Sequence, residues 1–169
     1  ASVYASKAAM LANAEKPVPE VRTPREALAL AKLIMARIAA DDTGRVAPLH
    51  EWCPEWRMLS RHAQSMVGIC VRKHHAAYGV MQGNKIANAL CYGSDPARQL
   101  QIAEGWLKEH PADPSLLLTL GRLCLQTSLW GKARDYLESS LRVQRNPETC
   151  AELARLLAQL GDTERSNQL

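Results

Sequence analysis

The sequence contains no phenylalanine, and aromatic residues make up 5% of its 169 residues. Hydrophobic residues nevertheless account for 47% of the chain, so alanine and leucine must supply most of any core. Strands favour aromatic and β-branched residues, whereas alanine and leucine favour helices. The composition therefore predicts an all-α fold, and the length allows one domain or two small helical units.

Long hydrophobic runs are also missing. No apolar run reaches the roughly 18 residues that a membrane-spanning helix needs, and the N-terminus lacks the layout of a signal peptide. The five cysteines are an odd number and contain no C-x-x-C pair, a pattern that favours reduced thiols. We therefore expect a cytoplasmic protein without a membrane-spanning segment.

Motifs of the common enzyme classes are absent as well. The sequence has no Walker loop, no G-x-G-x-x-G, no G-x-S-x-G and no H-E-x-x-H, since His50-Glu51 is followed by Trp52. The paired carboxylates Asp41 and Asp42 fall at an expected helix end, where solvation explains them. We do not expect an enzyme.

The chain divides into three expected regions: an arm over residues 1–22, a helical module over 23–92 and a repeat region over 93–169. Positive charge is concentrated before the repeats, because residues 1–91 contain 12 Lys and Arg against 7 Asp and Glu, whereas 92–169 contain 9 against 10. The different charge balance indicates that the two helical regions have different partners or different evolutionary histories.

Local signals place the helices of the central module. Thr23, Pro24 and Glu26 form a capping box with proline in the first turn, so a helix should run from there to about Ala40. Pro54 suits the start of a second helix reaching about Tyr78. We expect Gly79 and Gly83 to break the chain before a short helix over residues 84–92.

The repeat region has regular punctuation. Helices are expected over residues 96–109, 114–127 and 132–142, with a turn near Trp130-Gly131, and a further helix from Pro147 to a turn at Gly161. The interval from Pro114 to Pro147 is about 33 residues, close to the roughly 34 residues of a tetratricopeptide unit. We call this interval the repeat period. Small and apolar residues recur at matching positions in the two copies, and we expect them to pack the repeats together: Leu117, Leu120, Gly121 and Cys124 in one copy, and Cys150, Leu153, Ala154 and Leu157 in the other. We expect Ala133 of the first copy and Gly161, at the internal turn of the second, to contribute to the same packing.

Stacked helix pairs of this kind form a concave groove that binds segments of other proteins. The string Leu-Trp-Gly-Lys-Ala-Arg at residues 129–134, with residues 95–107, 116–124 and 151–161, resembles the C-terminal tetratricopeptide region of the bacterial HemY family. The resemblance covers roughly residues 92–169. It implies a scaffold linked to porphyrin biosynthesis and associated with the inner membrane, and it brings no catalytic residues.

A second hypothesis is nucleic-acid binding by the central module. Arg57, Arg61, Arg72 and His75 fall on one stripe of the expected second helix, where they could follow a phosphate backbone or contact an acidic partner. The segment from Tyr78 to Leu90 also loosely resembles the turn and recognition helix of a helix-turn-helix.

A third hypothesis is a haem or zinc site. Cys53 precedes a proline and is flanked by Trp52 and Trp56, a setting in which a thiolate can bind haem iron. Cys70 and His74 share one helix face in an i,i+4 arrangement and could hold a metal. A core position is the more ordinary explanation of these residues, so no cofactor is assigned.

Overall fold

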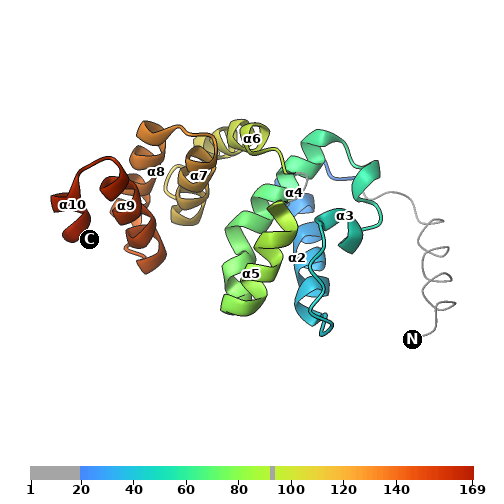
Figure 1. Ribbon diagram of the computed structural model, residues 1–169. Helices are drawn as coiled ribbons and strands as arrows, with labels where there is room; N and C mark the ends of the chain where they lie inside the picture. The colour runs from blue at the N-terminus through green and yellow to red at the C-terminus, as the bar shows by residue number, and fades with distance from the viewer. Residues whose placement is uncertain (1–19, 92–93) are drawn as a thin grey trace, which may run out of the picture. The chain divides into compact units, whose positions relative to one another are not determined.

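The computed structural model describes residues 20–91 and 94–169, so most of the expected N-terminal arm lies outside the described residues. Both ranges contain helices and turns and no strand, which confirms the all-α prediction (Figure 1). The chain forms two compact units, one reaching to Ser94 (unit 1) and one beginning at Asp95 (unit 2). Over the described residues, no helix has both the length and the apolar character to cross a membrane.

Among the described residues of unit 1, the first helix is α2, Pro24–Ala40, and it starts as predicted. The Thr23 hydroxyl accepts a hydrogen bond from the Glu26 amide at 3.2 Å, and the Glu26 carboxylate accepts one from the Thr23 amide at 3.3 Å. This reciprocal pair satisfies two amides that a helix start would otherwise leave without partners. The capping box read from the sequence is therefore confirmed.

The second helix of unit 1 does not begin at Pro54. The chain forms α3, Leu49–Trp52, a 3-10 turn, Trp56–Met58, and then α4, Arg61–His74. Ser60 begins α4, because its hydroxyl accepts a hydrogen bond from the Ala63 amide at 3.0 Å. A serine cap competes well with a proline as a helix start, and Pro54 instead follows α3 in a turn.

The expected break occurs at Gly79, which separates a 3-10 turn from the next helix, but the break expected at Gly83 is wrong. After a 3-10 turn, His75–Tyr78, the helix α5 runs over Gly79–Cys91 and contains both glycines. Gly79 has φ +85°, which allows the sharp entry into α5. Gly83 is buried, and a Cβ placed there would lie 3.0 Å from the His75 carbonyl oxygen. Gly83 thus permits a close contact between α5 and the preceding turn.

The core of unit 1 lies where α2 packs against α4 and α5. Its largest fully buried side chains are Ile34, Met35, Ile38, Leu49, Met66, Ile69 and Ile86. At its edge the Lys85 ammonium lies 2.7 Å from the Asp41 carboxylate, holds the pKa of that carboxyl below its usual value, and donates to the Asp41 carbonyl at 3.0 Å. Lys85 also lies 5.6 Å from the ring centre of Trp52, so this pair joins α2, α3 and α5.

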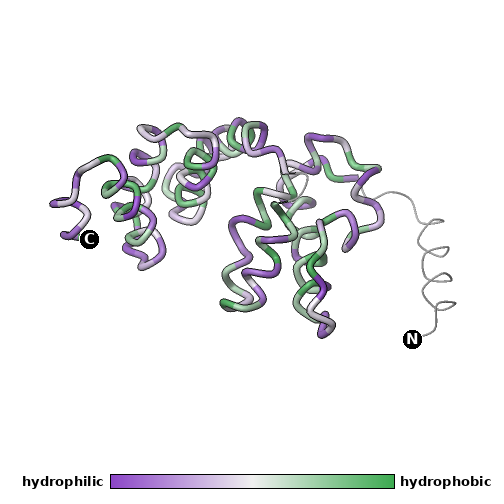
Figure 2. The backbone as a smooth tube through the Cα atoms, in the orientation of Figure 1, coloured by the Kyte–Doolittle hydropathy of each residue, from purple (hydrophilic) through white to green (hydrophobic). Residues whose placement is uncertain are grey.

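Unit 2 is a succession of helices, each packed on the next. They are α6, Pro96–Glu109; α7, Pro114–Gln126; α8, Trp130–Val143; α9, Pro147–Gln159; and α10, Thr163–Asn167. Trp130 and Gly131, expected in a turn, lie in the first turn of α8. Apolar and polar residues alternate along these helices (Figure 2). This pattern is expected when each helix buries one side and exposes the other.

The backbone of unit 2 recurs at the repeat period. The helices α7 and α9 each contain 13 residues, and both follow a capping side chain, Asp113 or Asn146. After α7 the Leu129 amide donates to the Cys124 carbonyl at 2.8 Å, and after α9 the Asp162 amide donates to the Leu157 carbonyl at 2.8 Å. Matching starts and matching turns show that two segments of the chain adopt the same local structure.

Side-chain ion pairs follow nearly the same spacing. The Lys132 ammonium on α8 lies 2.8 Å from the Glu104 carboxylate on α6. The Arg165 guanidinium on α10 lies 2.9 Å from the Glu138 carboxylate on α8. The two cations are separated by the repeat period and the two carboxylates by almost the same interval, so similar pairs connect α6 to α8 and α8 to α10.

Most residues expected to pack the repeats are buried. Leu117, Leu120, Gly121, Cys124, Ala133, Leu153 and Leu157 belong to this group. Ala154 is half-buried, and the short α10 reaches it through Ser166, whose hydroxyl donates to the Ala154 carbonyl at 2.8 Å. Gly161 is exposed and has φ +85°, so its role is in the backbone of the turn.

Gly121 should be sensitive even to a methyl group. A Cβ at this position would lie 2.7 Å from Cδ2 and 2.8 Å from Cγ of the fully buried Leu137. We expect Gly121→Ala to lower the free energy of unfolding by about 1–3 kcal/mol, measured by chemical denaturation. The cost should largely disappear in a Leu137→Ala background. In the control Gly105→Ala, the Cβ meets nothing within 4 Å, so this change should raise the free energy of unfolding by about 0.5–1 kcal/mol.

Ser128 occupies a conformation that suits glycine. Its φ is +59°, and Gly161, one repeat period later, has φ +85° in the equivalent turn. Because left-handed backbone costs other residues about 1–2 kcal/mol, we expect Ser128→Gly to stabilise the chain by roughly 0.5–1 kcal/mol in thermal or chemical unfolding. The control Ser139→Gly, inside α8, should destabilise it. Equal destabilisation by both changes would contradict the assignment.

Candidate functional site

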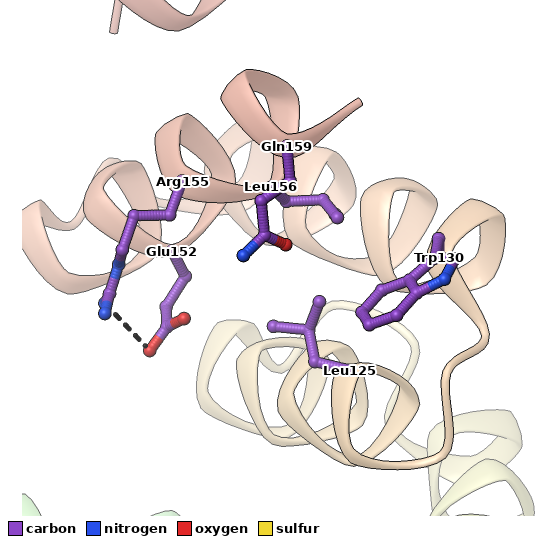
Figure 3. Close-up of a pocket in the computed structure, with 6 residues that line it drawn as sticks. All are labelled: Leu125, Trp130, Glu152, Arg155, Leu156 and Gln159. Carbon is purple, nitrogen blue, oxygen red and sulfur yellow. Dashed lines mark ion pairs between the residues drawn. The ribbon is translucent and has the colours of Figure 1, made fainter. Parts of the chain in front are cut away.

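Unit 2 contains a hollow of about 220 Å³ where the end of α7, the start of α8 and one side of α9 meet (Figure 3). Six residues line it: Leu125, Trp130, Glu152, Arg155, Leu156 and Gln159. They belong to the two segments that recur at the repeat period. The hollow therefore arises where one helix pair packs on the next.

One end of the hollow is apolar. Trp130 is 43% exposed and its ring faces the hollow from the start of α8, while Leu125 on α7 is half-buried and Leu156 on α9 is buried (Figure 3). The bond from the Leu129 amide to the Cys124 carbonyl sets the tight turn that places Trp130 there. An exposed indole beside two leucines is a surface that gains free energy when another apolar group covers it.

The other end is polar and contains charges of both signs. One oxygen of Glu152 lies 3.3 Å from Nε of Arg122 on α7 and 3.3 Å from a terminal nitrogen of Arg155 on α9. A second ion pair joins Arg122 to Glu148 at 3.5 Å. Arg122 thus ties α7 to α9, and Arg155, whose guanidinium has five donor hydrogens, retains donors for a further acceptor.

The size and lining of the hollow fit a side chain of another protein. Ligand pockets usually measure roughly 300–1,000 Å³, so this one suits a single large apolar side chain with polar neighbours. The lining contains neither a nucleophile nor a pair of proton-transferring groups. The sequence did not reveal this site, because Trp130 was expected in a turn, whereas it begins α8 and faces the hollow.

The basic stripe expected on the second helix does not form one exposed surface. Arg57 lies on the 3-10 turn before α4, and Arg61 lies in the first turn of α4, both exposed. Arg72 is half-buried and donates to the Ser94 hydroxyl at 3.1 Å. His75 places Nδ1 3.1 Å from the Arg72 carbonyl oxygen. Arg57 and Arg61 are therefore the exposed members of the stripe, whereas Arg72 and His75 are half-buried, and nucleic-acid binding by these residues stays a prediction.

The helix-turn-helix interpretation is not favoured either. Most of the residues expected to form its turn lie inside α5. At the start of that helix, Val80 and Met81 are 82% and 83% exposed, and Lys85 pairs with Asp41. A recognition helix normally presents polar and basic side chains to DNA. The exposed side chains of α5 are apolar at Val80 and Met81 and polar at Asn84 and Asn88, and its one lysine is already paired.

The cysteines considered for haem or metal occupy core positions. Cys53 is fully buried and its thiol donates to the Glu55 carboxylate at 3.2 Å; burial raises its pKa to about 11. Burial likewise raises the pKa of Cys70 to about 11, and His74, at the end of α4, is half-buried. The thiolate is the form that binds metal, and burial disfavours that form at both cysteines, so a core role fits them and the haem or metal site stays a prediction. Among the described residues, no three or more metal-ligating side chains are grouped.

Comparison with known proteins adds no relative. Protein-family models, curated proteins and solved structures were all searched, and none of them matches this chain. The geometry of the chain itself is therefore the basis for assigning a function.

Thiol reactivity provides a direct check on the cysteine assignments. Cys91 is exposed, whereas Cys53, Cys70 and Cys124 are buried, and burial raises the pKa of each of these three thiols to about 11. Because thiolates are the reacting species, we expect Cys91 to react rapidly with Ellman's reagent in the native protein and these three to react after unfolding. Cys91→Ser should remove the fastest phase and leave the slower reaction of the half-buried Cys150. Rapid native reaction at Cys53 would contradict the buried assignment.

Proposed function

We propose that this chain is a protein-interaction scaffold of the tetratricopeptide type, and that the hollow of unit 2 receives an apolar side chain of its partner. The observation that supports the proposal most directly is the position of the hollow. It opens where two helix pairs with the same register meet, which is where such arrays form their groove.

The register is supported by several independent features of unit 2. Helix lengths, capping side chains and the backbone bonds after α7 and α9 all recur at the repeat period. The close contact of Gly121 with Leu137 is the approach that a small residue permits between paired helices. Chance similarity would not be expected to reproduce caps, turns and ion pairs together.

A link to porphyrin biosynthesis is part of the proposal and follows from the resemblance to the HemY family alone. The tryptophan of the string that supports the resemblance, Trp130, is also the exposed indole of the hollow. If the resemblance is functional, the partner is a protein that acts in that pathway.

Peptide selection tests the proposed site. Random peptides displayed on phage would be selected on the full chain, and their affinities measured by calorimetry. Because an aromatic anchor covered by a partner contributes about 2 kcal/mol or more, we expect Trp130→Ala to weaken selected peptides by at least about tenfold.

Val143 provides the matched control. It is 45% exposed at the opposite end of α8, and Val143→Ala should leave peptide affinity unchanged. Failure to select any peptide, or peptides that bind the Trp130→Ala variant as tightly as the original chain, would overturn the proposed site.

A further inference from the structure

Arg122 and Arg155 occupy equivalent positions, one repeat period apart, but differ in their partners. Arg122 on α7 reaches across to α9, where it pairs with Glu148 at 3.5 Å and Glu152 at 3.3 Å. Arg155 on α9 turns back on its own helix, with Nη2 3.3 Å from Glu152 and Nε 3.4 Å from the Ala151 carbonyl oxygen. The side chain of Arg155 is 69% exposed, against 28% for Arg122.

The neighbours of the two arginines differ in the same way. Leu118 and Leu125 stand at i−4 and i+3 from Arg122, so the three share one side of α7. Leu118 is 8% exposed and Leu125 is half-buried. The equivalent residues around Arg155 are Ala151 and Ala158, and both are exposed. We call Ala151, Arg155 and Ala158 the α9 face.

The chain itself shows what fits such a face. On α7 the arginine receives a helix with two carboxylates in an i,i+4 arrangement, Glu148 and Glu152, which lie on the same side of α9. The alanines of the α9 face present small side chains to an approaching backbone, and the exposed guanidinium supplies the complementary charge.

We propose that the α9 face binds a helix of a partner protein that carries two acidic residues in an i,i+4 arrangement, in the place that α9 takes on α7. The proposal rests on the same register as the proposed function, but it uses Arg155 and the two alanines and not the apolar end of the hollow. A second copy of the chain is the less suitable occupant, because its own acidic pair is already engaged by Arg122.

The test uses a probe taken from the chain. A fluorescent peptide with the sequence of residues 146–162 contains the acidic pair in its native spacing. Titrated with the full chain and followed by anisotropy, it should bind saturably. Arg155→Glu should weaken binding by at least about tenfold. A peptide with arginine in place of both glutamates should bind the Arg155→Glu variant and not the original chain.

Three variants separate the alternatives. Arg142→Glu changes an exposed arginine on α8 and should leave the affinity for the peptide unchanged. Trp130→Ala should also leave this affinity unchanged, even though it weakens the binding of peptides in the hollow. Loss of binding in Arg122→Glu with none in Arg155→Glu would show that the peptide replaces α9, and would overturn the proposal.

Two further outcomes would also overturn it. Absence of saturable binding up to about 1 mM peptide is one. Self-association of the chain that Arg155→Glu abolishes, measured by light scattering, is the other, because a second copy would then be the occupant. Circular dichroism melting of Arg155→Glu, with Arg155→Gln as the milder variant, checks that the fold is retained.

Discussion

The contact between Gly121 and Leu137 is the constraint on which unit 2 depends. With no side chain on Gly121, α8 approaches α7 closely enough for Leu137 to lie fully buried over the glycine. That approach makes α7 and α8 the most extensively packed pair of helices in the described chain. It also fixes where α8 begins, and hence where the Trp130 ring lies relative to α9. The hollow and the ion pairs around it follow from this geometry.

Several helix starts could be predicted from the sequence because their signals are local. A capping side chain followed by proline marks the beginnings of α2, α6, α7 and α9, and in each case the cap accepts a backbone hydrogen bond from the first turn. Helix boundaries were predicted wrongly where contacts with other parts of the chain determine them. Gly83 reads as a helix breaker, but the His75 carbonyl oxygen approaches it so closely that only glycine fits without adjustment. Nothing in the local pattern reveals that approach.

The same distinction applies to the candidate sites. A helical projection placed Arg72 on one stripe with Arg57 and Arg61. Because a projection considers one helix at a time, it could not show that Arg72 donates a hydrogen bond to Ser94, beyond α5. Periodicity identified the buried residues of the repeats, since burial follows spacing along a helix. It did not identify the hollow, whose lining comes from three helices and depends on the ion pairs of Arg122.

Two surfaces of unit 2 with the same spacing of residues differ in chemistry. Arg122 on α7 is half-buried and pairs with two carboxylates of α9. Arg155, one repeat period later, pairs within α9 and stays exposed. An exposed ion pair within a helix is worth roughly 0.3–0.5 kcal/mol, so little free energy holds Arg155 in its present position. A helix that offers two carboxylates would therefore compete easily for it, and the small alanines beside it would add little steric resistance.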